Sequence, residues 1–150
     1  MKPGAILIVD DDSDVRSALA ELLEEEGFSV EAARNGREAL LRLRTGKIHP
    51  ALILLDLMMP GMDGWDFRSE QMRDPRLASV PVVIVSASGF SSESIRTQFG
   101  PAAYVEKPIE KDVLLGAIRA IVRSDPRAGP RSGPPGQLDA PQGAGDPQDD

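Results

Sequence analysis

Four short runs rich in apolar residues each lead to a polar side chain that could take part in chemistry. The side chains at the ends of these runs are Asp10, Asp11, Asp56, Ser86 and Lys107. Carboxylates packed together raise one another's pKa unless a cation lies among them, and ligands that are all oxygens favour a hard ion such as Mg²⁺. A carboxylate, a divalent ion, a lysine and a hydroxyl are the groups that phosphoryl transfer requires. Because an aspartate can itself be the nucleophile, Asp56 is the candidate acceptor.

Each of these residues also has a simpler explanation when it is considered alone. Asp10–Asp12 could be the solvated start of a helix, where acidic side chains are favourable. Asp56 could cap the turn that follows it, Ser86 could be a core hydroxyl, and Lys107 could be a surface ammonium. These separate explanations do not account for all four groups lying at one edge of a sheet, which is the arrangement that the order of elements predicts.

Strand-like and helix-like segments alternate along residues 4–123. The predicted strands are residues 5–9, 28–32, 51–55, 82–86 and 102–106. The predicted helices begin after a cap at Asp12 or Ser13 (ending at Gly27), after a cap at Asn35, and near residues 64, 91 and 110, with the last three ending near 72, 99 and 123.

Five strands that alternate with five helices predict an α/β fold with a doubly wound, parallel, five-stranded sheet. The continuous apolar run before Asp56 agrees with this fold, because a strand buried on both faces does not alternate. In such sheets, ligands bind outside the carboxyl ends of the strands, where the strand order switches. The candidate residues all lie at the ends of predicted strands or directly after them, so we expect them to meet at that edge.

The composition restricts the compartment and the partners. The chain has 150 residues, which favours a single domain, and no cysteine, which excludes disulfides and thiolate chemistry. We therefore expect a reducing, cytoplasmic location. The N-terminus has neither a signal peptide's apolar segment nor a membrane span. The formal charge is −7 and no basic stripe is visible, which argues against direct nucleic-acid binding.

The last part of the chain differs from the rest. Residues 124–150 are rich in proline and glycine and carry too few apolar side chains to offset the entropy of ordering. We predict a folded domain over residues 1–123 and a disordered acidic tail over 124–150, which is too short and polar for a DNA-binding module.

Four segments together resemble the receiver domain of bacterial two-component response regulators: ILIVDDDSDVRSAL, LILLDLMMPGMDGW, VVIVSAS and AAYVEKPI. The resemblance covers about residues 4–123, in order and with nearly the family's spacing. It implies a flavodoxin-like (βα)5 fold with strand order 2-1-3-4-5. It also implies a stand-alone receiver that works in phosphorelay signal transduction.

The resemblance implies a role in phosphoryl transfer or Mg²⁺ binding for each of the following residues. Asp56 accepts the phosphoryl group as a 4-aspartylphosphate, and Lys107 pairs with the charge of that group. Mg²⁺ is bound by Asp56, by Asp11 directly, by Asp10 largely through water, and by the backbone carbonyl of Met58.

The resemblance also implies how phosphorylation is read. Ser86 hydrogen-bonds a phosphoryl oxygen, and Tyr104 is the aromatic switch that turns inward when Ser86 moves. Met58 and Ser88 flank the site and tune the access of water to the acyl phosphate. The Lys107–Pro108 peptide bond is expected to be cis.

A sensor histidine kinase or a histidine phosphotransfer protein is the implied phosphoryl donor. The implied output surface comprises the fourth helix, the fifth strand and the last helix, through which a protein partner, or a homodimer formed on phosphorylation, reads the state. The implied catalysis is self-phosphorylation and slow autodephosphorylation only. Ser86–Lys107 is about one residue shorter than usual, and Gly89, Gly100 and Pro101 weaken the predicted fourth helix, so partner choice at this surface is open.

Two other classes remain as alternatives. An aspartyl-nucleophile phosphohydrolase of the haloacid-dehalogenase type usually has a second aspartate two residues after the nucleophile, and Met58 occupies that position here. A receiver-shaped interaction module that never needs phosphate would not need the acidic set, Ser86 and Lys107 together.

Overall fold

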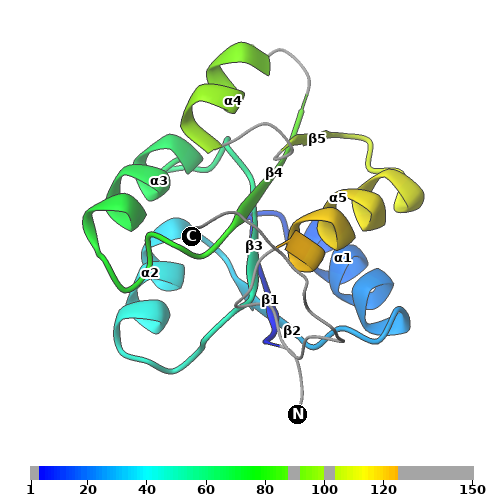
Figure 1. Ribbon diagram of the computed structural model, residues 1–150, viewed down its shortest axis with the longest axis horizontal. Coiled ribbons are helices and arrows are strands. Elements are labelled where there is room, and N and C mark those ends of the chain that lie inside the picture. The colour runs from blue at the N-terminus through cyan, green and yellow to red at the C-terminus, as the bar shows by residue number, and fades with distance from the viewer. Residues whose placement is uncertain (1–3, 88–91, 100–103, 125–150) are drawn as a thin grey trace, which may run out of the picture.

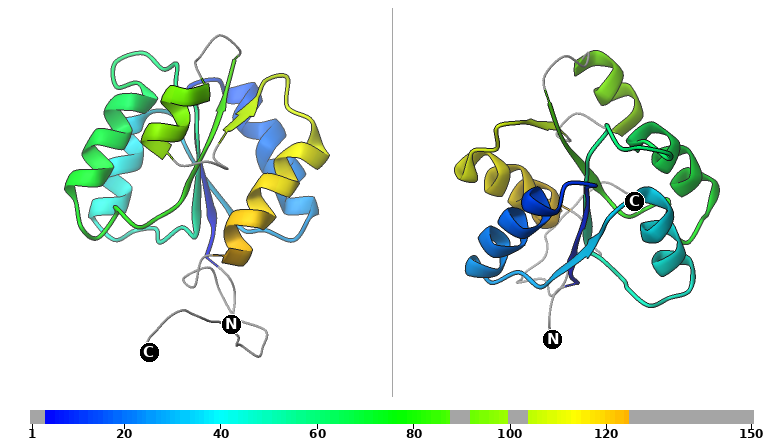
Figure 2. Two further views of the ribbon diagram at one scale, coloured as in Figure 1. Left: turned by 45° about the horizontal axis from the view of Figure 1, so that its top comes forward. Right: turned by 180° about the vertical axis from the view of Figure 1, so that it is seen from behind.

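The computed structural model describes residues 4–87, 92–99 and 104–124, in which a parallel sheet lies between two layers of helices (Figures 1 and 2). The strands are β1 (Ile6–Val9), β2 (Val30–Ala33), β3 (Leu52–Leu55), β4 (Val82–Ser86) and β5 (Tyr104–Glu106). The helices are α1 (Ser13–Glu25), α2 (Gly36–Arg44), α3 (Gly64–Arg73), α4 (Ser92–Phe99) and α5 (Lys111–Ser124). The strand order is β2-β1-β3-β4-β5, which confirms the predicted fold.

The central strands are buried on both faces, which explains their continuous apolar runs. In β1, Leu7 and Val9 join a core with α2, α3 and α4, whereas Ile6 and Ile8 join a second core with α1 and α5. Figure 1 shows these two sets of helices on opposite sides of the sheet. The residues of β1 and β3 therefore all remove apolar surface from water, and the polar side chains of the site stand at the last residue of a strand or directly after it.

The second strand begins two residues later than the sequence predicts, because the end of α1 uses the first residues of FSVEA. Gly27 has a φ of +93° and donates its N–H to Glu24 O, while Phe28 donates to Leu23 O at 3.1 Å. This pair of bonds closes a Schellman motif. Phe28 is consequently bound to the helix end, and β2 runs from Val30 to Ala33.

Side-chain caps set where three of the helices start. Asp12 caps α1 and Asn35 caps α2, as predicted, and Asp63 caps α3 by accepting from the Asp66 N–H at 2.8 Å. Each cap satisfies backbone donors that would otherwise lack a partner at a helix start. These starts lie close after strand ends, so they direct the helix N-termini toward the same edge of the sheet.

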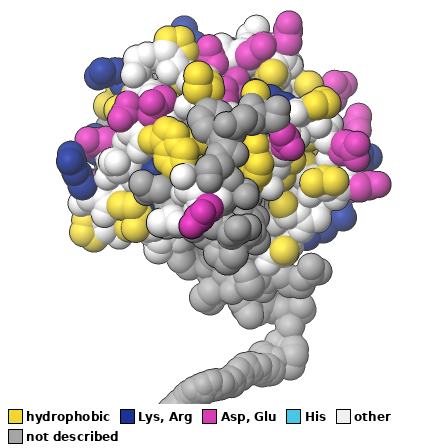
Figure 3. All heavy atoms as spheres, turned by 90° about the horizontal axis from the view of Figure 1, so that it is seen from above, with side chains coloured by type: hydrophobic (Ala, Val, Ile, Leu, Met, Phe, Trp, Pro, Cys, Tyr) yellow, Lys and Arg dark blue, Asp and Glu magenta, His cyan; other side chains and the backbone are white. Residues whose placement is uncertain are grey.

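Several predictions fall outside the described residues: Ser88, the three residues that weaken the fourth helix, residues 102–103 of the predicted fifth strand, and the tail beyond Ser124. Within the described part, α4 is the shortest helix, with 8 residues. Among the described helices, none has both the length and the apolar character needed to cross a membrane. On the face shown in Figure 3, acidic side chains are spread between hydrophobic ones, and basic side chains lie mainly toward the edges.

Candidate functional site

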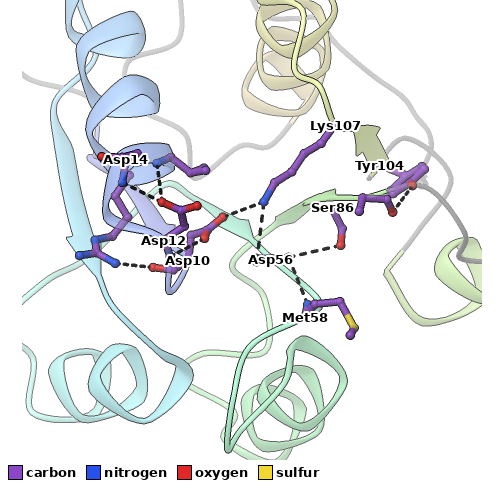
Figure 4. A network of polar contacts seen from close by, with 11 residues as sticks. Asp10, Asp12, Asp14, Asp56, Met58, Ser86, Tyr104 and Lys107 are labelled. Atoms are coloured by element: carbon purple, nitrogen blue, oxygen red, sulfur yellow. Dashed lines mark hydrogen bonds and ion pairs between the residues drawn. The ribbon is translucent and has the colours of Figure 1, made fainter.

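Asp56 is the residue around which the predicted site assembles. Its side chain follows β3 and is only 6% exposed. The carboxylate oxygen Oδ1 accepts hydrogen bonds from the Met58 N–H at 3.1 Å and from Ser86 Oγ at 3.3 Å. The other oxygen, Oδ2, lies 3.8 Å from Lys107 Nζ. Figure 4 shows these three contacts converging on Asp56 from separate segments of the chain.

Asp10 holds Lys107 in the site. It is 2% exposed, and its Oδ2 accepts from Lys107 Nζ at 3.2 Å, a shorter contact than the one from Lys107 to Asp56. Its Oδ1 accepts from the Asp12 N–H at 2.9 Å. The lysine reaches between the two buried carboxylates (Figure 4), so its ammonium offsets part of their mutual repulsion. The Lys107–Pro108 peptide bond is cis, as predicted.

Asp10, Asp11 and Asp56 form a cluster whose chemistry suits a magnesium ion. Each offers one carboxylate oxygen, and these oxygens lie within 4.8 Å of one another, with Asp11 the only exposed member. An octahedral Mg²⁺ with bonds of about 2.1 Å places opposite ligand oxygens about 4.2 Å apart. The cluster therefore fits this ion after a small movement, or with one carboxylate acting through water.

Burial sets the electrostatics of Asp56. Desolvation raises the pKa of Asp56 above its ordinary value of 3.8, and the negative charge of Asp10 raises it further. The hydrogen bond from the Met58 N–H, the charge of Lys107 and the hydrogen bond from Ser86 oppose this rise. The ionised carboxylate is therefore costly here unless a cation compensates it, which is the situation that a divalent ion would relieve.

This cost predicts a pH-dependent stability in the absence of metal. Because the folded-state pKa of Asp56 is raised, the folded protein binds this proton more tightly than the unfolded chain, and stability falls as the pH rises through the folded pKa. We expect Asp56→Asn to have the larger free energy of unfolding at neutral pH with chelator present. The advantage should shrink toward zero near pH ~4, the unfolded pKa. Urea unfolding across this range measures it, and an advantage that grows as the pH falls would contradict the assignment.

The β3–α3 loop brings the start of α3 against the strand end. Gly64 donates its N–H to Leu57 O at 2.9 Å. A Cβ at Gly64 would lie 2.7 Å from Leu57 Cα and 2.9 Å from Asp56 O, which are backbone atoms that cannot turn away. Met58, between them in sequence, projects outward and is 62% exposed. The position at 64 has to be glycine for this close approach.

Gly64→Ala should therefore cost about 1–3 kcal/mol of stability, the usual range for an overpacked buried position. Gly116 in α5 is the matched control, because a Cβ there meets nothing within 4 Å. Gly116→Ala should instead stabilise by about 0.5–1 kcal/mol. Denaturant unfolding of both variants compares the two. Similar changes in both would show that the contact with the Asp56 backbone has no effect.

Ser86 and Tyr104 are the two residues that the sequence predicts to form the switch. Ser86 is fully buried and Tyr104 is half-buried. The Ser86 hydroxyl donates to Asp56 Oδ1 (Figure 4). The Tyr104 hydroxyl donates to the backbone carbonyl of Ala87, the next residue after Ser86, at 3.4 Å. Burial, and then the charge of Glu106, raise the pKa of Tyr104. Through its bond to Ala87, Tyr104 contacts the segment that carries Ser86.

The structure brings together Asp10, Asp11, Asp56, Ser86 and Lys107, as the sequence predicts, and places the Met58 backbone beside them. Two contributors were not predicted. Gly64 permits the close approach of α3, and Arg16 donates from Nη1 to the Asp10 carbonyl at 2.8 Å. The sequence offers only a weak signal for either, a glycine directly after the cap Asp63 and an arginine one turn into α1.

Comparisons with known proteins agree with this geometry. Residues 6–119 match the model of the response regulator receiver domain family. Response regulator Rre1 from Synechocystis sp. is 37% identical over 120 residues, which cover 79% of this chain and 51% of Rre1. Protein PilH from Pseudomonas aeruginosa is 31% identical over 117 residues, which cover 77% of this chain and 95% of PilH. The chain spans about half the length of Rre1 and of the transcriptional regulator ycf27 from Pyropia yezoensis.

Solved structures of receiver domains and chemotaxis proteins share this fold. The signal receiver domain of a signal transduction histidine kinase from Syntrophus aciditrophicus superposes with a TM-score of 0.72 at 30% identity, covering 86% of this chain and 97% of that one. Chemotaxis protein CheY4 from Vibrio cholerae gives a TM-score of 0.67 at 27% identity, covering 79% of this chain and 98% of that one.

Proposed function

Because this chain belongs to the response regulator receiver domain family, we propose that it is a phosphorelay protein that accepts a phosphoryl group on Asp56. The observation that carries this proposal is the position of the Asp56 carboxylate, which lies between the hydroxyl of Ser86 and the ammonium of Lys107, with two further carboxylates beside it. A buried carboxylate with these neighbours is suited to accept a phosphoryl group and to stabilise the charge that arrives with it.

Each residue of the cluster has a distinct part in the proposed transfer. Asp11 and Asp56, with the Met58 carbonyl, hold Mg²⁺ directly, and Asp10 acts through water. Bound Mg²⁺ supplies charge neutralisation between the carboxylates and the incoming phosphoryl oxygens. Asp56 reacts as the carboxylate, so the bond between phosphorus and the donor breaks as the bond to Asp56 forms. Lys107, already 3.2 Å from Asp10 and 3.8 Å from Asp56, can follow the new negative charge.

The proposed switch passes from Asp56 to the surface through Ser86 and Tyr104. A phosphoryl group adds nearly two negative charges and three strong acceptor oxygens. Ser86 would leave Asp56 Oδ1 to donate to one of those oxygens, and the adjoining Ala87 carbonyl would move with it. The Tyr104 hydroxyl would then lose its present acceptor and turn inward. The surface of α4, β5 and α5 changes shape as a result, and the relative populations of its two states set partner binding.

The proposed partners follow from this chemistry. A sensor histidine kinase or a histidine phosphotransfer protein supplies the phosphoryl group, and a protein partner, or a second copy of the chain, reads the switched surface. Met58, exposed beside Asp56, and Ser88 are proposed to tune water access and hence slow autodephosphorylation. The proposed receiver spans residues 1–123, and the proposed tail spans residues 124–150.

Intact mass tests the proposal with the wild-type protein. Incubation with Mg²⁺ and acetyl phosphate should add one phosphoryl group per chain, and chelator should prevent it. A generic phosphoester in the same buffer should not turn over, since the second position after Asp56 is Met58 and supplies no acid. Sustained turnover would favour the phosphohydrolase. If no adduct forms and beryllofluoride also leaves Trp65 fluorescence unchanged, the phosphate-independent module is favoured.

A further inference from the structure

Arg16 contacts Asp10 but is not itself a member of the acidic cluster formed by Asp10, Asp11 and Asp56. It lies one turn into α1 and is half-buried, and its Nη1 donates to the backbone carbonyl of Asp10 at 2.8 Å. We propose that Arg16 is a positioning residue for the metal site, and that its guanidinium fixes the turn that aims Asp10 and Asp11 at Asp56. The inference rests on the proposed binding of Mg²⁺ to these carboxylates.

The position of the Asp10 carbonyl explains why it needs a side-chain donor. Asp10 still donates its N–H to Ala33 O of β2 at 3.2 Å, so its amide remains in the sheet. β1 and β2 end at Val9 and Ala33, and the chain turns away toward α1. Arg16 supplies the hydrogen bond to the carbonyl at this turn. A bond from a guanidinium is stronger than one from a neutral donor, so it holds the turn firmly.

Arg16 closes a ring of hydrogen bonds around the turn. The Asp12 N–H donates to Asp10 Oδ1 at 2.9 Å, and the Arg16 N–H donates to Asp12 O at 3.0 Å. The Arg16 side chain then returns to the Asp10 carbonyl. Asp11 lies between Asp10 and Asp12 in sequence, so both of its neighbours are held by these bonds. Its carboxylate is exposed, yet one of its oxygens stays within 4.8 Å of those of Asp10 and Asp56.

The ring matters because the cluster is one of like charges. Without a fixed turn, repulsion among three carboxylates favours swinging the exposed Asp11 away into solvent. Because the turn is already fixed, Asp11 does not have to be reoriented when a cation binds. The cation then meets carboxylate oxygens that are already close together. Groups that orient metal ligands in this way typically change metal affinity by about 10–100-fold when they are removed.

Arg42 provides a matched control for the type of contact. Its Nη1 also donates to a backbone carbonyl, that of Ala32 in β2, at 2.7 Å. This arginine also lies on a helix that follows its strand, but Ala32 is an exposed edge residue and no member of the acidic cluster adjoins it. Removing Arg42 therefore removes the same type of hydrogen bond, together with an ion pair from Nη2 to Glu31 at 2.7 Å, without contacting the Asp10–Asp12 turn.

The test is calorimetric titration of Mg²⁺ into the unphosphorylated full chain. We expect Arg16→Met to weaken Mg²⁺ binding by about tenfold, Arg16→Lys to weaken it less because one cationic donor remains, and Arg42→Met to change it less than about twofold. At saturating Mg²⁺, the rate of adduct formation by Arg16→Met should return close to that of the wild type, since only the metal affinity is impaired.

The outcomes distinguish failure of the positioning role of Arg16 from failure of the proposed function. Wild-type affinity in Arg16→Met, or an equal loss in Arg42→Met, would overturn the positioning role. If the wild type itself does not bind Mg²⁺, the proposed function fails before the inference is reached. Should Arg16→Met not fold, as judged by circular dichroism, the folded pair Arg16→Gln and Arg16→Lys replaces it. Weaker binding by the glutamine variant is then required, and equal affinities reject the role.

Discussion

Asp56→Asn should abolish the phosphoryl adduct completely under conditions in which the wild type is modified. Asparagine has nearly the same shape, and its carbonyl oxygen can still accept from the Met58 N–H and Ser86 Oγ that now bond to Asp56 Oδ1. It lacks the carboxylate that, under the proposed function, would form the acyl phosphate. The fold should persist while the chemistry is lost. Intact mass after incubation with Mg²⁺ and acetyl phosphate measures the effect.

Asp63→Asn is the matched control for this loss. Asp63 lies in the same loop and caps α3 through the Asp66 N–H, a role that asparagine can also fill. This variant should be modified as the wild type is. An adduct that persists in Asp56→Asn would place the acceptor elsewhere. If partner binding and activity were instead unchanged in Asp56→Asn, the phosphate-independent module would become the better description.

Asp11→Asn should lower Mg²⁺ affinity by about 100-fold or more, beyond the usual effect of a group that only orients a ligand. Asp11 is the exposed carboxylate of the cluster, so removing its charge should leave packing intact and act on the metal alone. Adduct formation at limiting Mg²⁺ should fall in parallel. Calorimetric titration and intact mass follow the two effects.

Asp14→Asn separates a ligand from a general charge effect. Asp14 is an exposed acid in the first turn of α1, and its removal changes the net charge by the same amount. Because it lies outside the cluster, Mg²⁺ affinity should hardly change. Equal losses in the Asp11 and Asp14 variants would mean that the overall field of this edge, and not coordination by Asp11, determines binding.

The fold and the main site residues could be predicted because both depend on strand ends. A doubly buried strand has to be apolar, so a carboxylate such as Asp56 directly after one marks its exit from the sheet. In a parallel sheet all such exits lie at one edge. The same reasoning groups Asp10, Asp56 and Lys107, which directly follow strands, with Ser86, which is the last residue of β4.

The residues that sequence reasoning missed act through contacts that no local pattern records. Phe28 lies in a segment that alternates like a strand, but its N–H donates to Leu23 O and so belongs to the motif that terminates α1. Arg16 looks like an ordinary helix-surface cation. Gln71 looks like a polar helix residue, yet it is fully buried and its amide donates to Leu77 O and Val80 O at 2.9 Å. Tertiary geometry alone assigns these side chains.

The bridge from Lys107 to Asp10 joins residues that are 97 positions apart in the chain. Such a contact contributes only after the entropy of closing a very long loop has been overcome, so it forms late, with the sheet that surrounds it. During synthesis, a chain that has emerged only as far as β4 contains Asp56 and the acids but lacks the ammonium between them. Competence for phosphorylation is therefore a property of the finished fold, and a partly made chain has little capacity to draw phosphoryl groups from the relay.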